Sequence, residues 1–364
     1  MIPISKPFIG DEEKQLVMEV LDSGMLVQGP KVAALEQAFA SLCGTKYAIA
    51  SSSGTTALHM ALLAHGIGPG DEVITSPFTF IASVNSIVYT GASPVYVDID
   101  AASFNMNPDL IEAAITARTK AIMPVHLYGY PCDMDAITHI AERHGLALIE
   151  DAAQAVDADY KGRKIGSFGT TCFSLYATKN MHTGEGGMVT TNDESLAESM
   201  RLLRAHGSKR RYYHDILGYN FRMTDLHAAL GIAQIKRLAD FTAKRRANAA
   251  YLSAHIESVI TPQVKADYGH VWHQYTIRVP NASADDDSRR NAAVEQLTKA
   301  GIGTGIFYPI PANRQQHLLD LGLGGQSMPI AEQVAKEVIS LPVHPQLSQQ
   351  DLEAIVAAVN DLKC

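Results

Sequence analysis

The sequence predicts an α/β fold with a large, mostly parallel β-sheet that is covered by helices on both faces. Short apolar runs alternate with amphipathic runs of helical spacing between residues 47 and 153, and this alternation is typical of parallel sheets. The length of 364 residues is more than one hydrophobic core usually serves. We therefore expect a large domain, residues 1–245, and a smaller α+β domain, residues 246–364.

Amphipathic helices are expected to precede the sheet, because apolar residues repeat on one face and a glycine ends each run. They form an N-terminal helical arm over residues 12–24 and 30–44. The alternating part follows. Its strands are expected at 47–53, 71–76, 94–99, 120–127 and 146–153, and its helices at 54–66, 80–91, 107–115 and 133–145.

Two further strands, 171–178 and 187–192, are joined by a loop too short for a crossover helix, since parallel neighbours need a connection of about a dozen residues. One of the two is therefore expected to run antiparallel to the rest, which gives a mixed, seven-stranded sheet. The remaining expectations are a long helix over 225–256, a surface loop over 281–291, a strand over 271–279 and helices over 289–301 and 349–362.

The charge and cysteine content of the sequence indicate which kinds of partner and environment to expect. The net charge is −8 and the longest basic clusters are "KRR" at 209–211 and 244–246, so we expect neither a nucleic-acid nor a membrane surface as the main partner. Cys43, Cys132, Cys172 and Cys364 show no C-x-x-C spacing and are expected to be reduced, structural thiols. No metal site, signal peptide or membrane span is expected, and we expect a cytoplasmic protein.

Side chains with useful chemistry follow several of the expected strands. Ligands bind beyond the carboxyl ends of the strands in open α/β sheets. Ser53 can cap a helix that starts with Gly54, Thr55 and Thr56, which is equally an anion site or a plain capped helix. Other strands are followed by aromatics (Phe78, Phe80), a carboxylate with a nearby amide (Asp151, Gln154) and a lysine (Lys179).

The lysine lies in "YATKNMHTGEGGMVTTND", residues 176–193, where it precedes the glycines. A nucleotide-binding loop has the opposite order, so Lys179 is not expected to hold a nucleotide phosphate. Pyridoxal 5′-phosphate (PLP) suits the whole set. Its phosphate needs a helix N-terminus, its ring an aromatic face, its pyridine nitrogen a carboxylate, and its aldehyde a lysine for a Schiff base.

Over nearly its whole length the chain resembles the DegT/StrS family of sugar aminotransferases, which have the fold type I of PLP enzymes. The resemblance rests on ordered matches such as "SGTTALHMAL", "SPFTFIASVNSI", "EDAAQA", "FSLYATKNMHTGEGGMVTT", "LGYNFRMTDLHAALGIAQ", "HVWHQYTIRV" and "SLPVHPQLS". It implies a large PLP-binding domain and a small C-terminal domain.

The resemblance also implies roles for single residues. Lys179 matches the Schiff-base lysine and Asp151 the partner of the pyridine nitrogen, with Gln154 beside it. Phe80 matches the aromatic that stacks on the ring. The phosphate contacts are implied for Gly54, Thr55, Thr56 and Ser174, and for Asn220 from the neighbouring subunit of a homodimer.

Other positions face the sugar in the family, and several depart from the familiar pattern. Met25 stands where tryptophan is common, and Phe307 and Asn313 stand where histidine is common. With Tyr308 and His182 they form the expected substrate-binding set.

By resemblance we expect a ping-pong aminotransferase that moves an amino group from L-glutamate to a nucleotide-linked keto-deoxysugar with its ketone at C3 or C4. A keto-cyclitol is an alternative acceptor. A sugar dehydratase of the same family would carry histidine at the position of Lys179. A binding or regulatory protein without turnover need not retain Lys179, Asp151 and Gln154 together.

Overall fold

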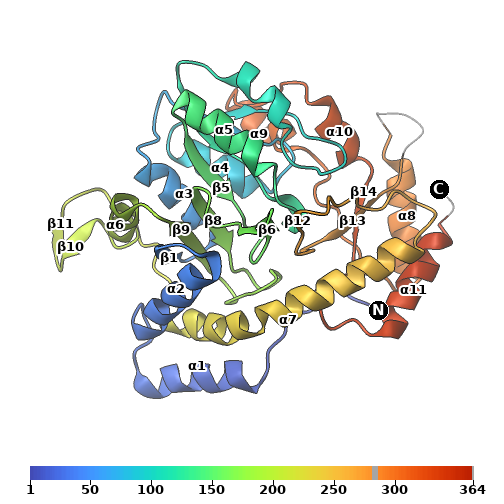
Figure 1. Ribbon diagram of the computed structural model, residues 1–364, viewed down its shortest axis with the longest axis horizontal. Coiled ribbons are helices and arrows are strands. Elements are labelled where there is room, and N and C mark those ends of the chain that lie inside the picture. The colour runs from blue at the N-terminus through green and yellow to red at the C-terminus, as the bar shows by residue number, and fades with distance from the viewer. Residues whose placement is uncertain (281–285, 363–364) are drawn as a thin grey trace.

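The computed structural model describes residues 1–280 and 286–362, and is built on a mixed seven-stranded sheet (Figure 1). Residues 281–285 of the expected surface loop and Cys364 lie outside the described residues. The strand order is β1-β9-β8-β5-β4-β2-β3. These strands are β1 Tyr47–Ser51, β2 Glu72–Thr75, β3 Ser93–Tyr96, β4 Thr119–Met123, β5 Ala147–Asp151, β8 Thr170–Ser174 and β9 Gly187–Thr191.

Only β9 runs against the other strands of this sheet, since it pairs antiparallel with both β1 and β8 while the remaining pairs are parallel. This confirms the expected mixed sheet and identifies the reversed strand. The short β8–β9 connection requires the reversal. It also places the loop that contains Lys179 next to the end of β1.

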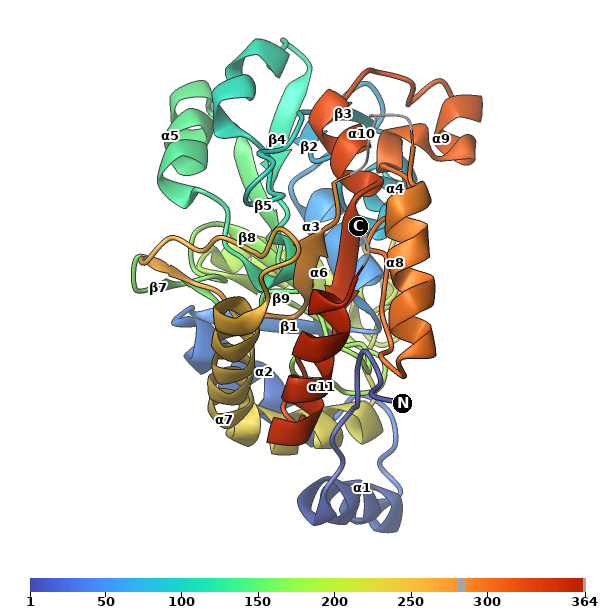
Figure 2. The ribbon, with the colours of Figure 1, turned by 90° about the vertical axis from the view of Figure 1, so that its right-hand side faces the viewer.

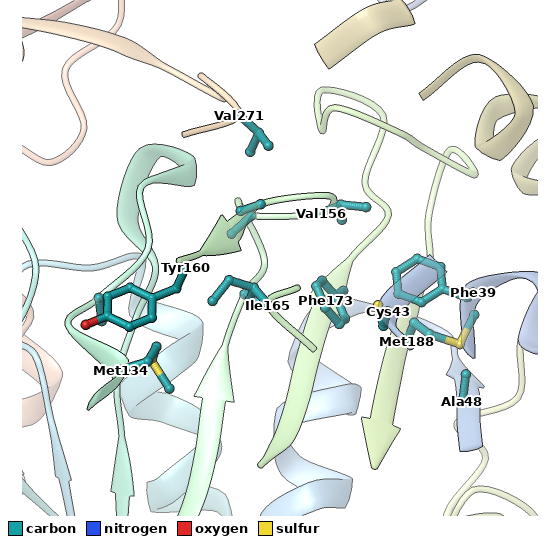
Figure 3. Close-up of a cluster of buried hydrophobic side chains, with 14 of the residues drawn as sticks. Phe39, Cys43, Ala48, Met134, Val156, Tyr160, Ile165, Phe173, Met188 and Val271 are labelled. Carbon is teal, nitrogen blue, oxygen red and sulfur yellow. The ribbon is translucent and has the colours of Figure 1, made fainter. Parts of the chain in front are cut away.

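Helices cover both faces of the sheet (Figures 1 and 2). One face carries α2 Pro30–Cys43, α5 Met134–His144 and the first half of α7 Asp225–His255, and the other carries α3 Gly54–Ala64, α4 Ile81–Tyr89 and α6 Glu194–Leu203. Neighbouring strand residues point to opposite faces. In β8, for example, Phe173 packs with Phe39 and Met188 in the cluster of Figure 3, whereas Cys172 joins the other cluster.

A buried carboxylate joins α2 to α7. Asp225, the first residue of α7, accepts hydrogen bonds from the backbone N–H groups of Gly29 (2.8 Å), Lys31 (3.1 Å) and Val32 (2.9 Å) at the start of α2. The first N–H groups of a helix have no intrahelical acceptors, so Asp225 satisfies them from a distant part of the chain. On the far side of α7 lies α1 Asp11–Ser23, a separate exposed helix (Figure 1).

The C-terminal part contains a second core. Its small sheet, β13 Tyr275–Arg278 with β14 Val338–Leu341, packs with α8 Ser288–Lys299, α11 Gln349–Asn360 and the last turns of α7. The remaining helices, α9 Gln316–Asp320 and α10 Pro329–Ala335, pack on the first part of the chain. Asp98 accepts from the N–H groups of Ile330 (2.9 Å) and Ala331 (3.0 Å) at the start of α10.

One expected helix is wrong. Residues 107–115 form two separate 3₁₀ turns, η1 Pro108–Leu110 and η2 Glu112–Ala114, instead of an α-helix. Ile115 is already extended, and Thr116 then donates a hydrogen bond to Glu72 at the start of β2 (2.5 Å). The chain has to leave the helical path there in order to enter β4 at Thr119.

Smaller elements complete the fold and were not expected from the sequence. They are a three-stranded sheet of β12 Tyr268–Gly269, β6 Asp159–Tyr160 and β7 Arg163–Lys164, a hairpin of β10 Ser208–Arg210 and β11 Tyr213–His214, and the turns η3 Leu127–Gly129 and η4 Ala312–Arg314. The hairpin projects from the body at the left of Figure 1. No helix among the described residues is long and apolar enough to cross a membrane.

Replacing Asp225 with alanine should lower the free energy of unfolding by about 3 kcal/mol, because the N–H groups at the start of α2 lose a charged acceptor. Urea denaturation followed by circular dichroism measures this change. Asp240→Ala, at an exposed position of the same helix, is the matched control and should stay within about 0.5 kcal/mol of the parent. Equal stability of the two variants would contradict the role given to Asp225.

Candidate active site

A cleft opens at the carboxyl ends of the parallel strands. Its volume is about 1310 Å³, part of it open to solvent. Residues that follow β1, β2, β4, β5 and β8 line it together with residues from the C-terminal part. They include Ser53, Gly54, Thr55, Phe80, Asp151, Gln154, Ser174, Tyr176, Lys179, His273, Phe307 and Tyr308. Residues from distant parts of the sequence therefore meet at the edge that the strand pattern predicts.

The N-terminus of α3 forms one end of the cleft. Ser53 caps the helix, since its Oγ accepts from the N–H of Thr56 (3.1 Å) and Thr56 Oγ1 accepts from the N–H of Ser53 (3.0 Å). The N–H groups of Gly54 and Thr55 have no acceptor among the described residues. Together with the positive end of the helix dipole, they can bind an anion such as a phosphate.

Close backbone contact brings this helix end against β8. A Cβ on Gly54 would lie 2.7 Å from the Cβ of Ser174, which is closer than side-chain carbons approach. Only glycine therefore lets Ser174 stand beside the first N–H groups of α3. The Oγ of Ser174 accepts from the N–H of Tyr176 (3.3 Å) and faces the cleft.

Asp151 is a buried carboxylate at the end of β5, with 4% of its surface exposed. Its Oδ2 accepts from Ser83 Oγ (2.6 Å) and its Oδ1 accepts from the N–H of Ala153 (3.0 Å). These donors fix the orientation of the carboxylate. It still borders the cleft, where a cationic ring nitrogen could meet it.

A buried pair, His126 and Glu150, supports the end of β5. His126 Nε2 lies 3.1 Å from Glu150 Oε2, and both side chains are fully buried. Because the N–H of Cys132 donates to His126 Nδ1 (3.0 Å), the ring proton is on Nε2 and points to Glu150. The backbone N–H of His126 donates to the carbonyl of Asp151 (3.0 Å), so the pair supports the position of Asp151.

Lys179 lies in the β8–β9 loop and borders the cleft. Its side chain is half-buried, and its ammonium group makes no hydrogen bond or ion pair with the described residues. Burial lowers the pKa of Lys179 to about 8, and attraction to Asp151 partly offsets this effect. A sizeable fraction of the amine is therefore neutral near pH 8, which is the form that attacks a carbonyl.

Gln154 connects this centre to the far wall of the cleft. Its Oε1 accepts from the N–H of Tyr128 (2.7 Å), and its Nε2 donates to the hydroxyl of Tyr308 (3.1 Å). Tyr128 in turn donates to the carbonyl of Phe307. Phe80 is 55% exposed at the cleft, with its ring 6.1 Å from that of Tyr308. The expected aromatic Phe80 and two of the five expected substrate-side residues, Phe307 and Tyr308, thus line the same cleft.

Several expected site residues lie outside this cleft. The side chain of Thr56 is used in the cap of α3. His182 is buried against the carbonyl of Phe8 (3.3 Å), and Asn313 is buried, with its Nδ2 donating to the carbonyl of Gln326 (2.7 Å). Met25 and Asn220 are exposed on the surface. Within one chain, these residues do not contribute side chains to the cleft.

His273 is a cleft residue that the sequence analysis did not single out. It is buried, its Nδ1 lies 3.3 Å from Asn180 Oδ1, and it borders the cleft. Burial lowers the pKa of His273 well below its usual value, and the charges of Lys179 and Arg245 act in the same direction. It is therefore a neutral imidazole. The sequence did offer an indication of this residue, because His273 lies in "HVWHQYTIRV", one of the segments that match the family.

Comparison of this chain with known sequences and structures identifies its family. The sequence profile of the DegT/DnrJ/EryC1/StrS aminotransferase family matches residues 7–360. The chain belongs to this family. The aminotransferases of this family depend on PLP, and solved structures similar to this chain include PLP and PMP forms.

The similarity extends over complete chains. The chain is 44% identical to the spore coat polysaccharide biosynthesis protein SpsC of Bacillus subtilis, over 99% of this chain and 97% of the relative. It is 41% identical to GDP-perosamine synthase of Caulobacter vibrioides, over 99% and 98%. Among solved structures, DesV of S. venezuelae in complex with a ketimine intermediate is 40% identical, covers 96% of this chain and 94% of its own, and has a TM-score of 0.91.

The residues of the cleft fit PLP. The two free N–H groups at the start of α3 and the close approach allowed by Gly54 suit a phosphate, and the unpaired amine of Lys179 suits the aldehyde. Asp151 and Phe80 border the space between them, where the ring would lie.

The lowered pKa of Lys179 predicts its reactivity in the cofactor-free protein. Methylation of Lys179 by formaldehyde with sodium cyanoborohydride as the reductant, followed by mass spectrometry, should speed up as the pH rises. The midpoint should be about 8, because only the neutral amine attacks formaldehyde. In Asp151→Asn the midpoint should move to lower pH, since the attraction that favours the ammonium form is removed. A midpoint near the usual value of 10.5 would contradict the effect of burial.

Proposed function

We propose that this protein transfers an amino group from L-glutamate to the ketone of a nucleotide-linked deoxysugar, at C3 or C4, with PLP as cofactor. The observation that carries the proposal is the arrangement of Lys179 and Asp151 in one cleft with the free N-terminus of α3. Support for a nucleotide-linked acceptor comes from the names of relatives such as GDP-perosamine synthase.

When bound, PLP supplies an electron sink for the negative charge that develops at the carbon bearing the amino group. Lys179 would hold it through Nζ and, once released, would move the proton to and from that carbon. A pKa of about 8 suits this work, because a general base is most effective when its pKa lies near the operating pH. Asp151, oriented by Ser83 and Ala153, would keep the ring nitrogen protonated.

The other cofactor contacts follow from the same cleft. Gly54, Thr55 and Ser174 would hold the phosphate, Phe80 would cover the ring, and Gln154 would lie beside it. On the acceptor side, Phe307 and Tyr308 narrow the cleft, and a hollow with Asn85 and His317 continues past Phe80 and Tyr308 to the surface. That hollow offers room for the bulkier part of a nucleotide-linked substrate.

The acceptor can be identified with a panel of nucleotide-linked 3-keto and 4-keto deoxysugars and a keto-inositol. With PLP and glutamate, we expect 2-oxoglutarate release with at least one nucleotide-linked ketosugar, and loss of at least about 10³-fold in rate in Lys179→Ala. The panel is followed by mass spectrometry of the aminated product. Turnover with the keto-inositol alone would replace the proposed acceptor by a cyclitol, and an undiminished rate in Lys179→Ala would refute the role of Lys179.

We also propose that the enzyme is a homodimer in which Asn220 completes the partner's active site. Asn220 is exposed and follows the projecting hairpin, whose neighbourhood exposes Tyr212, Tyr213, Ile216 and Leu217. The loop after α1 likewise exposes Met25, Leu26 and Val27. Exposed apolar groups of this kind are typical of a surface that another chain covers.

Mixing two inactive variants tests the shared site. Lys179→Ala and Asn220→Ala should each have low activity, and subunits exchanged between them should recover about a quarter of the parent's active sites, because a mixed dimer has one intact site. Activity is measured after unfolding and refolding the variants together and apart. If each site uses one chain only, the mixture will be no more active than the sum of its parts.

A further inference from the structure

A second, smaller cavity lies behind Lys179. The N-terminal segment Ser5–Phe8 closes one side of it, residues Pro345 and Gln346 close another, and Arg245 and His182 border it as well. The N-terminal segment reaches this place by running beside α7 and α11 (Figures 1 and 2). Lys179 borders both this cavity and the cleft. The space suits a single small ion or water molecule.

Arg245 brings a buried positive charge to this cavity, and no carboxylate among the described residues forms an ion pair with it. Its side chain belongs to α7 and is 6% exposed. One terminal nitrogen donates to the carbonyls of Trp272 (2.9 Å) and His273 (3.5 Å), whereas Nε has no partner in the part of the chain that the structure describes. Burial lowers the pKa of Arg245 to about 10, so the guanidinium is still charged at neutral pH. A buried charge is strongly disfavoured unless an opposite charge pairs with it.

His182 adds a second unsatisfied group to the same cavity. It is 4% exposed, its Nε2 faces the carbonyl of Phe8, and its Nδ1 has no partner within residues 1–280 and 286–362. Glu13 is the carboxylate that acts on His182, but it already accepts hydrogen bonds from the N–H of Gly10 (2.9 Å) and from Gln234 Nε2 (2.8 Å). It therefore does not enter the cavity as a counter-ion.

We propose that this cavity binds a small monovalent anion such as chloride, held mainly by the guanidinium of Arg245. A water molecule would satisfy the hydrogen-bonding groups but would leave the charge uncompensated. An anion would satisfy these groups and compensate the charge. Because Lys179 forms part of the wall, the anion also offsets the positive charge that Arg245 and Lys179 place near His273.

Bromide replaces chloride and can be located directly. Crystals of the holoenzyme soaked in sodium bromide should show an anomalous peak within hydrogen-bonding distance of the Arg245 guanidinium. A cavity that contains only water at high bromide concentration would overturn the proposal. This measurement needs neither a substrate nor a variant, so its failure is distinguishable from failure of the proposed transamination.

A solution measurement tests whether Arg245 is responsible. At constant ionic strength, replacing sodium gluconate with sodium chloride should raise the melting temperature of the holoenzyme until the site saturates, because a ligand that binds only the native state stabilises it. Arg245→Gln should lose this rise. Arg246→Gln is the matched control, since its guanidinium is half-exposed and faces Asp159 (3.6 Å), and it should keep the rise.

Two results of the chloride experiment would contradict the proposal. An undiminished chloride effect in Arg245→Gln would overturn the assignment of the site, as would a parent enzyme that responds equally to chloride and gluconate. If Arg245→Gln does not fold, because it loses the hydrogen bond to Trp272, the bromide experiment on the parent enzyme still decides the question.

Discussion

The cleft depends on a backbone contact between the start of α3 and the ends of β8 and β9. A Cβ on Gly187 would lie 2.2 Å from the carbonyl oxygen of Ser53, and one on Gly54 would lie 2.7 Å from the Cβ of Ser174. Side chains at these positions would push the helix away from the sheet. The two glycines therefore set the separation between the start of α3, with its two free N–H groups, and the loop that contains Lys179.

The strand–helix pattern was predictable where buried residues alternate or repeat on one face. Every expected strand of the large sheet is present, and the end of β5 and the β8–β9 loop deliver Asp151 and Lys179 to one cleft as expected. The failure at residues 107–115 has a tertiary cause, since Glu72 binds the residue that follows. No local pattern in the sequence contains that contact.

Site residues were predictable to the extent that strand order controls their position. Gln154 and Phe80 follow strands and border the cleft. By contrast, His182 borders the smaller cavity behind Lys179, and the side chain of Asn313 donates a hydrogen bond to the carbonyl of Gln326. His273 was missed because it comes from the segment that precedes β13, outside the large sheet. Its contribution depends on how the two parts of the chain pack together, which spacing along the sequence does not reveal.

The packing around Arg245 has a further consequence. Trp272, whose carbonyl Arg245 binds, is the single tryptophan of the chain and is buried between the rings of His270 and Tyr275. It directly precedes His273 in the cleft wall. The protein thus carries its single tryptophan beside His273, which borders the cleft, and in contact with Arg245, which borders the smaller cavity. Its emission is therefore a probe of both sites. PLP bound in the cleft would quench this emission by energy transfer, and the proposed anion would change the polarity around the indole ring.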